Sequence, residues 1–415
     1  MKKILLFTIT VITGLNFNAQ TFPVGHMSVN FNDASRTTAG YSISGGITLP
    51  GSGRPVGTEI YYPATSAGNN TNVANGQFPV VVIGHGFVMT WDSYDNVYNQ
   101  LASHGYIVLL PRTEGGFSPT HSEFGADLKF LANEGMNLNS ISTSTALTTF
   151  NGKVLAKSAI GGHSMGAGSS FLGAASNTSI TCLFNFAAAT TNPSSISSAS
   201  LVTVPTLMIS GARDCVADTS VQNNHYSALS STKKFHVILN QLTHCDFGNG
   251  SNTNCVLGQS TSGCGNQVSN ALALPRYMNY LQNFLDNQLK NDCQAGQRFM
   301  DSIQSNSSLR VGRKITGTIA CATTNIQETS SLNQINIFPN PAEGKVVITF
   351  HALDQNPILF ELYDISGRLI FNETETPDKS NYSRKEIDIE SIDNGSYILY
   401  LNQNGFKKAF KLIKQ

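Results

Sequence analysis

The stretch KSAIGGHSMGAGSSFLG, residues 157–173, sets a short apolar run directly before a segment of small residues. Within it lies the chain's only GxSxG pentapeptide, at residues 162–166. Glycines at both ends of such a motif let neighbouring backbones pass closely, so the central serine can occupy a tight turn from a strand into a helix. The pattern predicts that Ser164 Oγ is presented at a strand end, where it could act as a nucleophile.

Similar apolar runs alternate with helical stretches on both sides of this motif. We predict strands at residues 57–63, 78–84, 106–111, 158–161, 181–187, 206–211 and 235–239. We predict helices at 93–104, 122–134, 166–175, 221–230 and 271–290. The continuous apolarity of runs such as 78–84 is typical of parallel strands buried on both faces. The alternation therefore predicts an α/β fold, with a sheet covered by helices on both faces.

A serine nucleophile needs a base to take its proton and an acid to orient that base. Asp214 follows the predicted strand 206–211, and His244 follows the strand 235–239. The chain order Ser, Asp, His is the one used by α/β-hydrolase folds. Asp218 is the rival acid, but it lies four residues further from its strand. We therefore predict Ser164, Asp214 and His244 as a catalytic triad.

The oxyanion of an acyl-transfer reaction needs two hydrogen-bond donors. We expect one from the amide of Met165, which follows the nucleophile, and the other from the amide of Phe87, in the loop after the strand 78–84. The Phe87 ring could also stack on an acyl or aromatic group. His85 and His163 flank this predicted site, and we interpret both as packing or hydrogen-bonding residues.

Composition limits the possible partners. The chain has 415 residues, with 26 basic and 26 acidic side chains, and only 13% of its residues are charged. This balance argues against nucleic acid as a partner and suits a neutral substrate. No CxxC or HExxH motif occurs, so we expect no metal site. We also expect no other cofactor, and we expect the protein to be a monomer.

The first twenty residues have the pattern of a secretory signal peptide. Two lysines precede an apolar stretch at residues 4–15, and Ala19 lies at a plausible cleavage point. No segment is long and apolar enough to predict an integral membrane helix. We therefore predict an exported protein whose catalytic domain spans residues 21–321.

Seven cysteines in an exported chain favour disulfides and leave one thiol over. Cys182 lies within an apolar run and is our choice for the unpaired one. We expect Cys215, beside the acid, to pair with Cys245, beside the base, and so to clamp the two loops together. The remaining predicted pairs are Cys255 with Cys264 and Cys293 with Cys321.

The composition changes at residues 322–333, which are rich in Ser, Thr, Asn and Gln and predict a linker. Beyond it, short alternating strands are separated by turn residues. We predict them at residues 335–338, 345–350, 358–363, 384–389, 397–402 and 407–413. These features predict a small C-terminal β-sandwich over residues 334–415.

Residues 57–292 resemble the cutinase-like bacterial polyester hydrolases, a group that includes poly(ethylene terephthalate) hydrolases. The resemblance rests on VVVIGHGF (80–87), LASHGYIV (101–108), GHSMG (162–166), VPTLMI (204–209) and DCVA (214–217). It implies the same triad, the same two oxyanion amides, and hydrolysis of short-chain acyl esters and polyesters. The family usually carries a tryptophan in the loop that here reads FAAATT (186–191).

The C-terminal segment resembles the type IX secretion sorting domain of Bacteroidetes, through IFPNP (337–341), LYDISGR (362–368), NGSYIL (394–399) and KLIK (411–414). This implies export through the periplasm by the type IX machinery, to the outside or the cell surface, with removal of the domain; a substrate-binding β module is the alternative. The predicted function is a secreted serine esterase. A noncatalytic binding protein and a serine peptidase on the same scaffold are the other hypotheses.

Overall fold

The structure is a computed structural model. It describes residues 22–36, 41–43, 47–49, 53–138, 145–319, 332–352, 355–365, 367–377, 382–403 and 406–415. The predicted signal peptide and most of the predicted linker lie outside these residues. The chain divides into two compact units, Met1–Cys321 and Ala322–Gln415.

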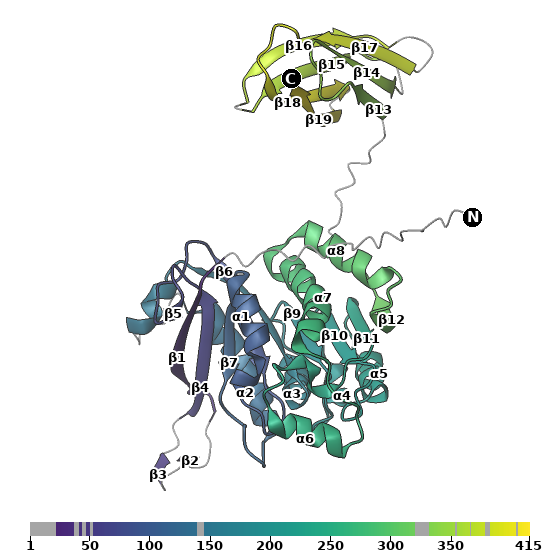
Figure 1. The fold of residues 1–415 in the computed structure, drawn as a ribbon. Coiled ribbons are helices and arrows are strands. Elements are labelled where there is room, and N and C mark those ends of the chain that lie inside the picture. Colours follow the sequence, from purple (N-terminus) through teal and green to yellow (C-terminus); the bar gives the residue numbers. More distant parts are fainter. Residues whose placement is uncertain are drawn as a thin grey trace, which may run out of the picture. The chain divides into compact units, whose positions relative to one another are not determined.

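The first unit is built on a ten-stranded sheet with the order β12-β11-β10-β9-β8-β6-β7-β4-β1-β5 (Figure 1). Its strands are β1 Val24–Asp33, β4 Arg54–Pro63, β5 Gly68–Asn69, β6 Phe78–Gly84, β7 Ile107–Pro111, β8 Val154–His163, β9 Cys182–Phe186, β10 Thr206–Gly211, β11 Lys234–Leu239 and β12 Arg310–Thr316. From β7 to β11 the neighbours pair in parallel. β4 and β12 join this block antiparallel, and β1 pairs antiparallel with β4. β2 Tyr41–Ile43 and β3 Ile47–Leu49 form a separate hairpin.

Helices cover both faces of this sheet, as predicted (Figure 1). One face carries α1 Asp95–Ser103, α7 Asn270–Lys290 and α8 Cys293–Gln304. The other carries α2 His121–Met136, α3 Met165–Ala174, α4 Ser195–Ala199 and α5 Thr219–Ala228. The helix α6 Thr253–Thr261 and three short 3-10 helices, η1 Trp91–Tyr94, η2 Thr145–Phe150 and η3 His244–Phe247, complete the helical elements of the described residues.

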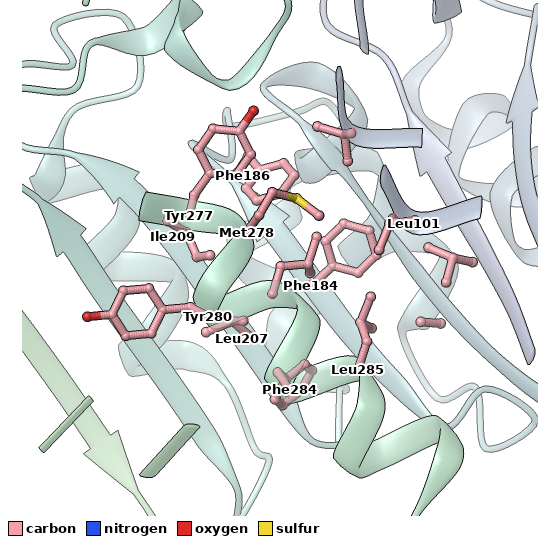
Figure 2. Packing of buried hydrophobic residues seen from close by; sticks show 14 of the residues in the cluster. Leu101, Phe184, Phe186, Leu207, Ile209, Tyr277, Met278, Tyr280, Phe284 and Leu285 are labelled. Carbon is pink, nitrogen blue, oxygen red and sulfur yellow. The ribbon is translucent and has the colours of Figure 1, made fainter. Parts of the chain in front are cut away.

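Apolar strands and amphipathic helices form the core. All seven residues of β6 are buried, as expected for a β-branched strand with helices on both faces. On α1, Val97 and Leu101 are one turn apart and both fully buried. Figure 2 shows how α7 packs on the sheet, with side chains from the helix and from β9 and β10 in one cluster: Tyr277, Met278, Phe284, Leu285, Phe184, Phe186, Leu207 and Ile209.

The sequence patterns did not predict every element, and β1, β12 and α8 show why. β1 alternates in burial, but most of its residues are polar or glycine, and pairing with β4 rather than apolarity makes it a strand. β12 is a polar strand that pairs along β11. α8 buries only a narrow stripe, with Phe299, Met300 and Ile303 at its centre.

The second unit is the predicted β-sandwich. One sheet has the order β13-β14-β17 and the other β16-β15-β18-β19. The strands are β13 Leu332–Phe338, β14 Lys345–Ala352, β15 Ile358–Asp364, β16 Leu369–Glu375, β17 Tyr382–Asp388, β18 Gly395–Gln403 and β19 Phe406–Lys414. Residues of both sheets, such as Val346 and Leu399, share one core. β16 was not predicted, because none of its residues is buried.

Candidate active site

Ser164 lies on the turn between β8 and α3, with φ 53° and ψ −117°. This left-handed conformation is strained for a residue with a side chain, and such strain costs about 1–3 kcal/mol. The close approach of β6 explains the glycines, because a Cβ on Gly162 would lie 2.5 Å from the Gly84 carbonyl oxygen and one on Gly166 would overlap the Gly84 backbone. A hydrogen bond from the Ser164 amide to the Phe186 carbonyl oxygen, at 3.0 Å, holds the turn in place.

The structure brings Ser164, His244 and Asp214 into one hydrogen-bonded line. His244 Nε2 lies 2.8 Å from Ser164 Oγ, and His244 Nδ1 lies 2.8 Å from Asp214 Oδ2. The other carboxylate oxygen of Asp214 accepts from the amides of Val216 and Ala217, both at 2.9 Å. Since a carboxylate only accepts, Nδ1 carries the proton in the neutral ring, and Nε2 is free to take the serine proton.

The rival acid occupies a different role. Asp218 is exposed and caps α5, where its side chain accepts from the amides of Ser220 and Val221 at 2.9 and 3.1 Å. Hydrogen bonds from the Ser220 hydroxyl and the Val221 amide lower the pKa of Asp218. This carboxylate stabilises a helix terminus, whereas Asp214 faces His244.

The two predicted oxyanion residues lie on adjoining segments. Met165 is the first residue of α3, and helix N-termini leave amides free to bind an anion. Phe87 lies in the loop after β6 and is 50% exposed. The two segments touch beside Ser164, because a Cβ on Gly84 would lie 3.0 Å from the Gly166 Cα.

His244 sits at the start of η3, and the following turn is braced from within. Asp246 Oδ2 accepts from the Thr243 amide at 2.6 Å and from its hydroxyl at 2.8 Å. Asp246 Oδ1 accepts from the Val268 amide at 3.0 Å. Burial raises the pKa of Asp246 in spite of these bonds. The sequence offered a signal for this brace, because Thr243 and Asp246 have the spacing of a capping box.

The disulfides differ from our prediction. Cys215 pairs with Cys264 and Cys245 pairs with Cys255, so the predicted Cys215–Cys245 clamp and the Cys255–Cys264 pair are wrong. Both partners come from the α6 segment, because Cys255 lies on α6 and Cys264 follows its end. Each loop is therefore tied to the α6 segment. Cys182 is free and buried, as predicted. Cys321 lies outside the described residues, so its pairing with Cys293 stays a prediction.

Two further histidines, His225 and His236, are buried and each contacts a serine. His225 Nε2 lies 2.8 Å from Ser195 Oγ, but both side chains are fully buried and the other ring nitrogen bonds to the Val221 carbonyl. His236 bonds to Ser210 in the same buried manner. Neither pair has the exposed hydroxyl and the carboxylate partner that a nucleophile requires.

Sequence comparison matches more than half of the chain to a known family. The sequence model of PET hydrolase-like proteins matches residues 29–287. The chain belongs to the PET hydrolase-like family. A second model, the secretion system C-terminal sorting domain, matches residues 336–415. No curated protein was found to match the sequence.

This PET hydrolase-like protein is therefore a hydrolase of the α/β class with a sorting domain of type IX secretion, which directs it to the extracellular space or the cell surface. None of the helices in the described part of the chain is long and apolar enough to cross a membrane. In that same part, no group of three or more His, Cys, Asp or Glu side chains is arranged to hold a metal ion.

Proposed function

We propose that the protein is a serine carboxylic ester hydrolase that works through an acyl-enzyme. The observation that carries this proposal is the line of two 2.8 Å contacts from Ser164 through His244 to Asp214. His244 takes the proton as Ser164 Oγ attacks the ester carbonyl, and then gives it to the departing alkoxide. Water, activated by the same histidine, releases the acid and restores the serine.

Two backbone amides would stabilise the negative charge of the tetrahedral intermediate. The tetrahedral intermediate places a negative charge on the former carbonyl oxygen, and preorganised donors lower its energy without reorganising. We assign these donors to the amides of Met165 and Phe87. The positive end of the α3 macrodipole adds to the stabilisation at Met165.

We further propose that the substrates are short-chain acyl esters and polyesters such as poly(ethylene terephthalate). Two exposed apolar side chains adjoin the catalytic residues and support this proposal. Phe87 is 50% exposed beside the oxyanion loop, and Val216, 46% exposed, is two residues after Asp214. Such surfaces favour contact with a neutral, apolar acyl group. A chain-length series of p-nitrophenyl esters, run beside a polyester film with identification of the products, tests this part.

The test of the reaction class uses a fluorophosphonate probe and p-nitrophenyl butyrate. We expect Ser164→Ala to abolish both labelling and turnover. The matched control is Ser195→Ala, because Ser195 also lies 2.8 Å from a histidine but is fully buried; this variant should label and turn over normally. An unlabelled wild-type protein would indicate a binding protein on a hydrolase scaffold. Cleavage of an amide substrate, together with no hydrolysis of the polyester film, would indicate a peptidase.

A further inference from the structure

A second line of buried hydrogen bonds reaches the backbone of His244 and involves no side chain of the proposed triad. Tyr94, at the end of η1, places its hydroxyl 2.9 Å from His163 Nδ1. The same hydroxyl accepts the Gly86 amide at 2.9 Å. On the far side of the ring, His163 Nε2 lies 2.9 Å from the His244 carbonyl oxygen. The line thus joins the oxyanion loop, the residue before the nucleophile, and the backbone of the base.

The chemistry of the groups allows one arrangement of protons in the neutral line. A carbonyl oxygen only accepts, so His163 Nε2 carries the proton. His163 Nδ1 is then an acceptor, and the Tyr94 hydroxyl donates a hydrogen bond to it. The competing acceptor for that proton is Met89 Sδ at 3.3 Å, and thioether sulfur accepts weakly. Burial and the neighbouring His244 lower the pKa of His163 well below its usual range, which keeps this ring neutral.

Gly86 connects this line to the oxyanion loop. Its amide is held by Tyr94, and its carbonyl oxygen accepts from the Met89 amide at 3.2 Å. The peptide that carries the Phe87 amide begins with that carbonyl group. Fixing both polar groups of Gly86 therefore fixes the direction of the Phe87 N–H. The position packs closely against this line, because a Cβ on Gly86 would lie 2.6 Å from Met89 Sδ and 3.3 Å from both His163 Nδ1 and the Tyr94 hydroxyl.

We propose that Tyr94 and His163 are positioning residues, which hold the Phe87 amide and His244 at the separation that the tetrahedral intermediate requires. This inference rests on the proposed function. Neither residue touches the substrate, and both are at most 1% exposed. Misplacement of a catalytic group by about 1 Å can reduce the rate about 100-fold, so loss of part of the line should reduce the rate by about tenfold or more.

The experiment compares Tyr94→Phe with Tyr106→Phe. Both tyrosines are buried, and Tyr106 donates a 2.6 Å hydrogen bond to Asp286, away from the triad. In Tyr94→Phe we expect kcat on p-nitrophenyl butyrate to fall about tenfold, with KM changed less than about twofold. Inhibition by a boronic acid, which forms a tetrahedral adduct with the serine, should weaken by the same factor. Tyr106→Phe should lower the thermal midpoint and leave kcat unchanged.

A second variant, His163→Gln, keeps the test decisive if one protein folds poorly. We expect the double variant Tyr94→Phe/His163→Gln to be no slower than the slower single variant, since either change breaks the same line. Losses of kcat that multiply, or a Tyr94→Phe enzyme with normal kcat and boronate inhibition, would overturn the proposal. A wild-type protein that neither labels nor turns over esters would instead refute the proposed function.

Discussion

At the scale of single residues, the site depends on which carboxylate meets His244. Two residues of the same type, Asp214 and Asp218, follow β10 within eight residues, so residue type alone does not show which one meets His244. The backbone does, because the amides of Val216 and Ala217 hold one oxygen of Asp214 and leave the other for the imidazole. Asp218 starts a helix instead.

We predict that Asp214→Asn reduces kcat by about 10⁴-fold with little change in the thermal midpoint, because an amide at this position favours the wrong tautomer of His244. Steady-state kinetics with a soluble ester measure this effect. Asp218→Ala is the matched control. It should leave kcat unchanged and cost about 1 kcal/mol of the free energy of unfolding through the lost cap. The reverse pattern would make Asp218 the acid.

Strand positions predict some contacts between single residues and miss others. Ser164, Asp214 and His244 each follow a buried strand, and parallel strands bring their carboxyl ends to one edge of the sheet. That rule predicts which residues meet from the positions of the apolar runs alone. Tyr94 follows no such rule. It meets His163 across 69 residues of sequence, through the path of η1, and only the folded chain reveals the contact.

At the scale of elements, the α6 segment is bonded to both the loop of Asp214 and the loop of His244. Cys255 binds it to the residue after His244, and Cys264, just beyond the helix, binds the segment to the residue after Asp214. Gln259 adds a buried contact, since its side-chain oxygen accepts the Cys245 amide at 2.9 Å. The predicted direct link between Cys215 and Cys245 is wrong, and each of these cysteines is bonded instead to a cysteine of the α6 segment.

We predict that the two disulfides stabilise the fold unequally. They close loops with sequence separations of 49 and 10 residues. In the loop-entropy description, replacing Cys215 and Cys264 by serine should cost about 4 kcal/mol, and replacing Cys245 and Cys255 about 3 kcal/mol. Urea unfolding of both variants measures these costs. Cys182→Ala is the control, and its sensitivity to reductant should equal that of the wild type. Equal midpoints for reduced and oxidised protein would contradict the prediction.

Asp286 on α7 contacts a residue of its own helix and two residues from the segment between α1 and β7. Tyr106, just before β7, donates to it at 2.6 Å, Lys290 of α7 lies 2.8 Å away, and His104, at the end of α1, lies 3.5 Å away. Burial alone would raise the pKa of Asp286. Hydrogen bonds from His104, Lys290 and Tyr106, together with the Lys290 charge, outweigh burial and lower the pKa to about 2.

The sign of this shift gives a pH prediction. A pKa lowered from 3.8 to about 2 means that ionised Asp286 stabilises the fold above about pH 4, and that this stabilisation is lost as the pH falls toward 2. Asp286→Asn should therefore be less stable than the wild type at pH 7, with the difference shrinking below pH 4. Urea unfolding at several pH values measures it, with exposed Asp301→Asn as the control. A constant difference across this range would contradict the assignment.

At the scale of the whole molecule, the two units have separate cores and separate tasks. The hydrolase core contains the sheet and its helices, and the sandwich core lies between two antiparallel sheets. The chain divides at Cys321. Catalysis belongs to the first unit, and the sorting sequence for type IX secretion belongs to the second.

We predict that a chain ending at Cys321 folds and retains kcat/KM on a soluble ester within about twofold, because each unit has its own core. Circular dichroism and steady-state kinetics measure this outcome. The same truncation should stop export to the cell surface in a host with type IX machinery. Full-length Ser164→Ala is the paired control, since it should be exported and inactive. A truncated protein that unfolds would show that the units depend on each other.

The sequence by itself determined the layers of the hydrolase unit, the strand ends where Ser164, Asp214 and His244 lie, the sandwich, and the free thiol at Cys182. These follow from hydrophobic periods and turn residues, which act over short stretches of chain. Only the tertiary structure decided the disulfide pairs, the polar strands β1 and β12, and the line from Gly86 through Tyr94 and His163 to His244. Those contacts depend on loop paths between distant segments, and no local pattern encodes such a path.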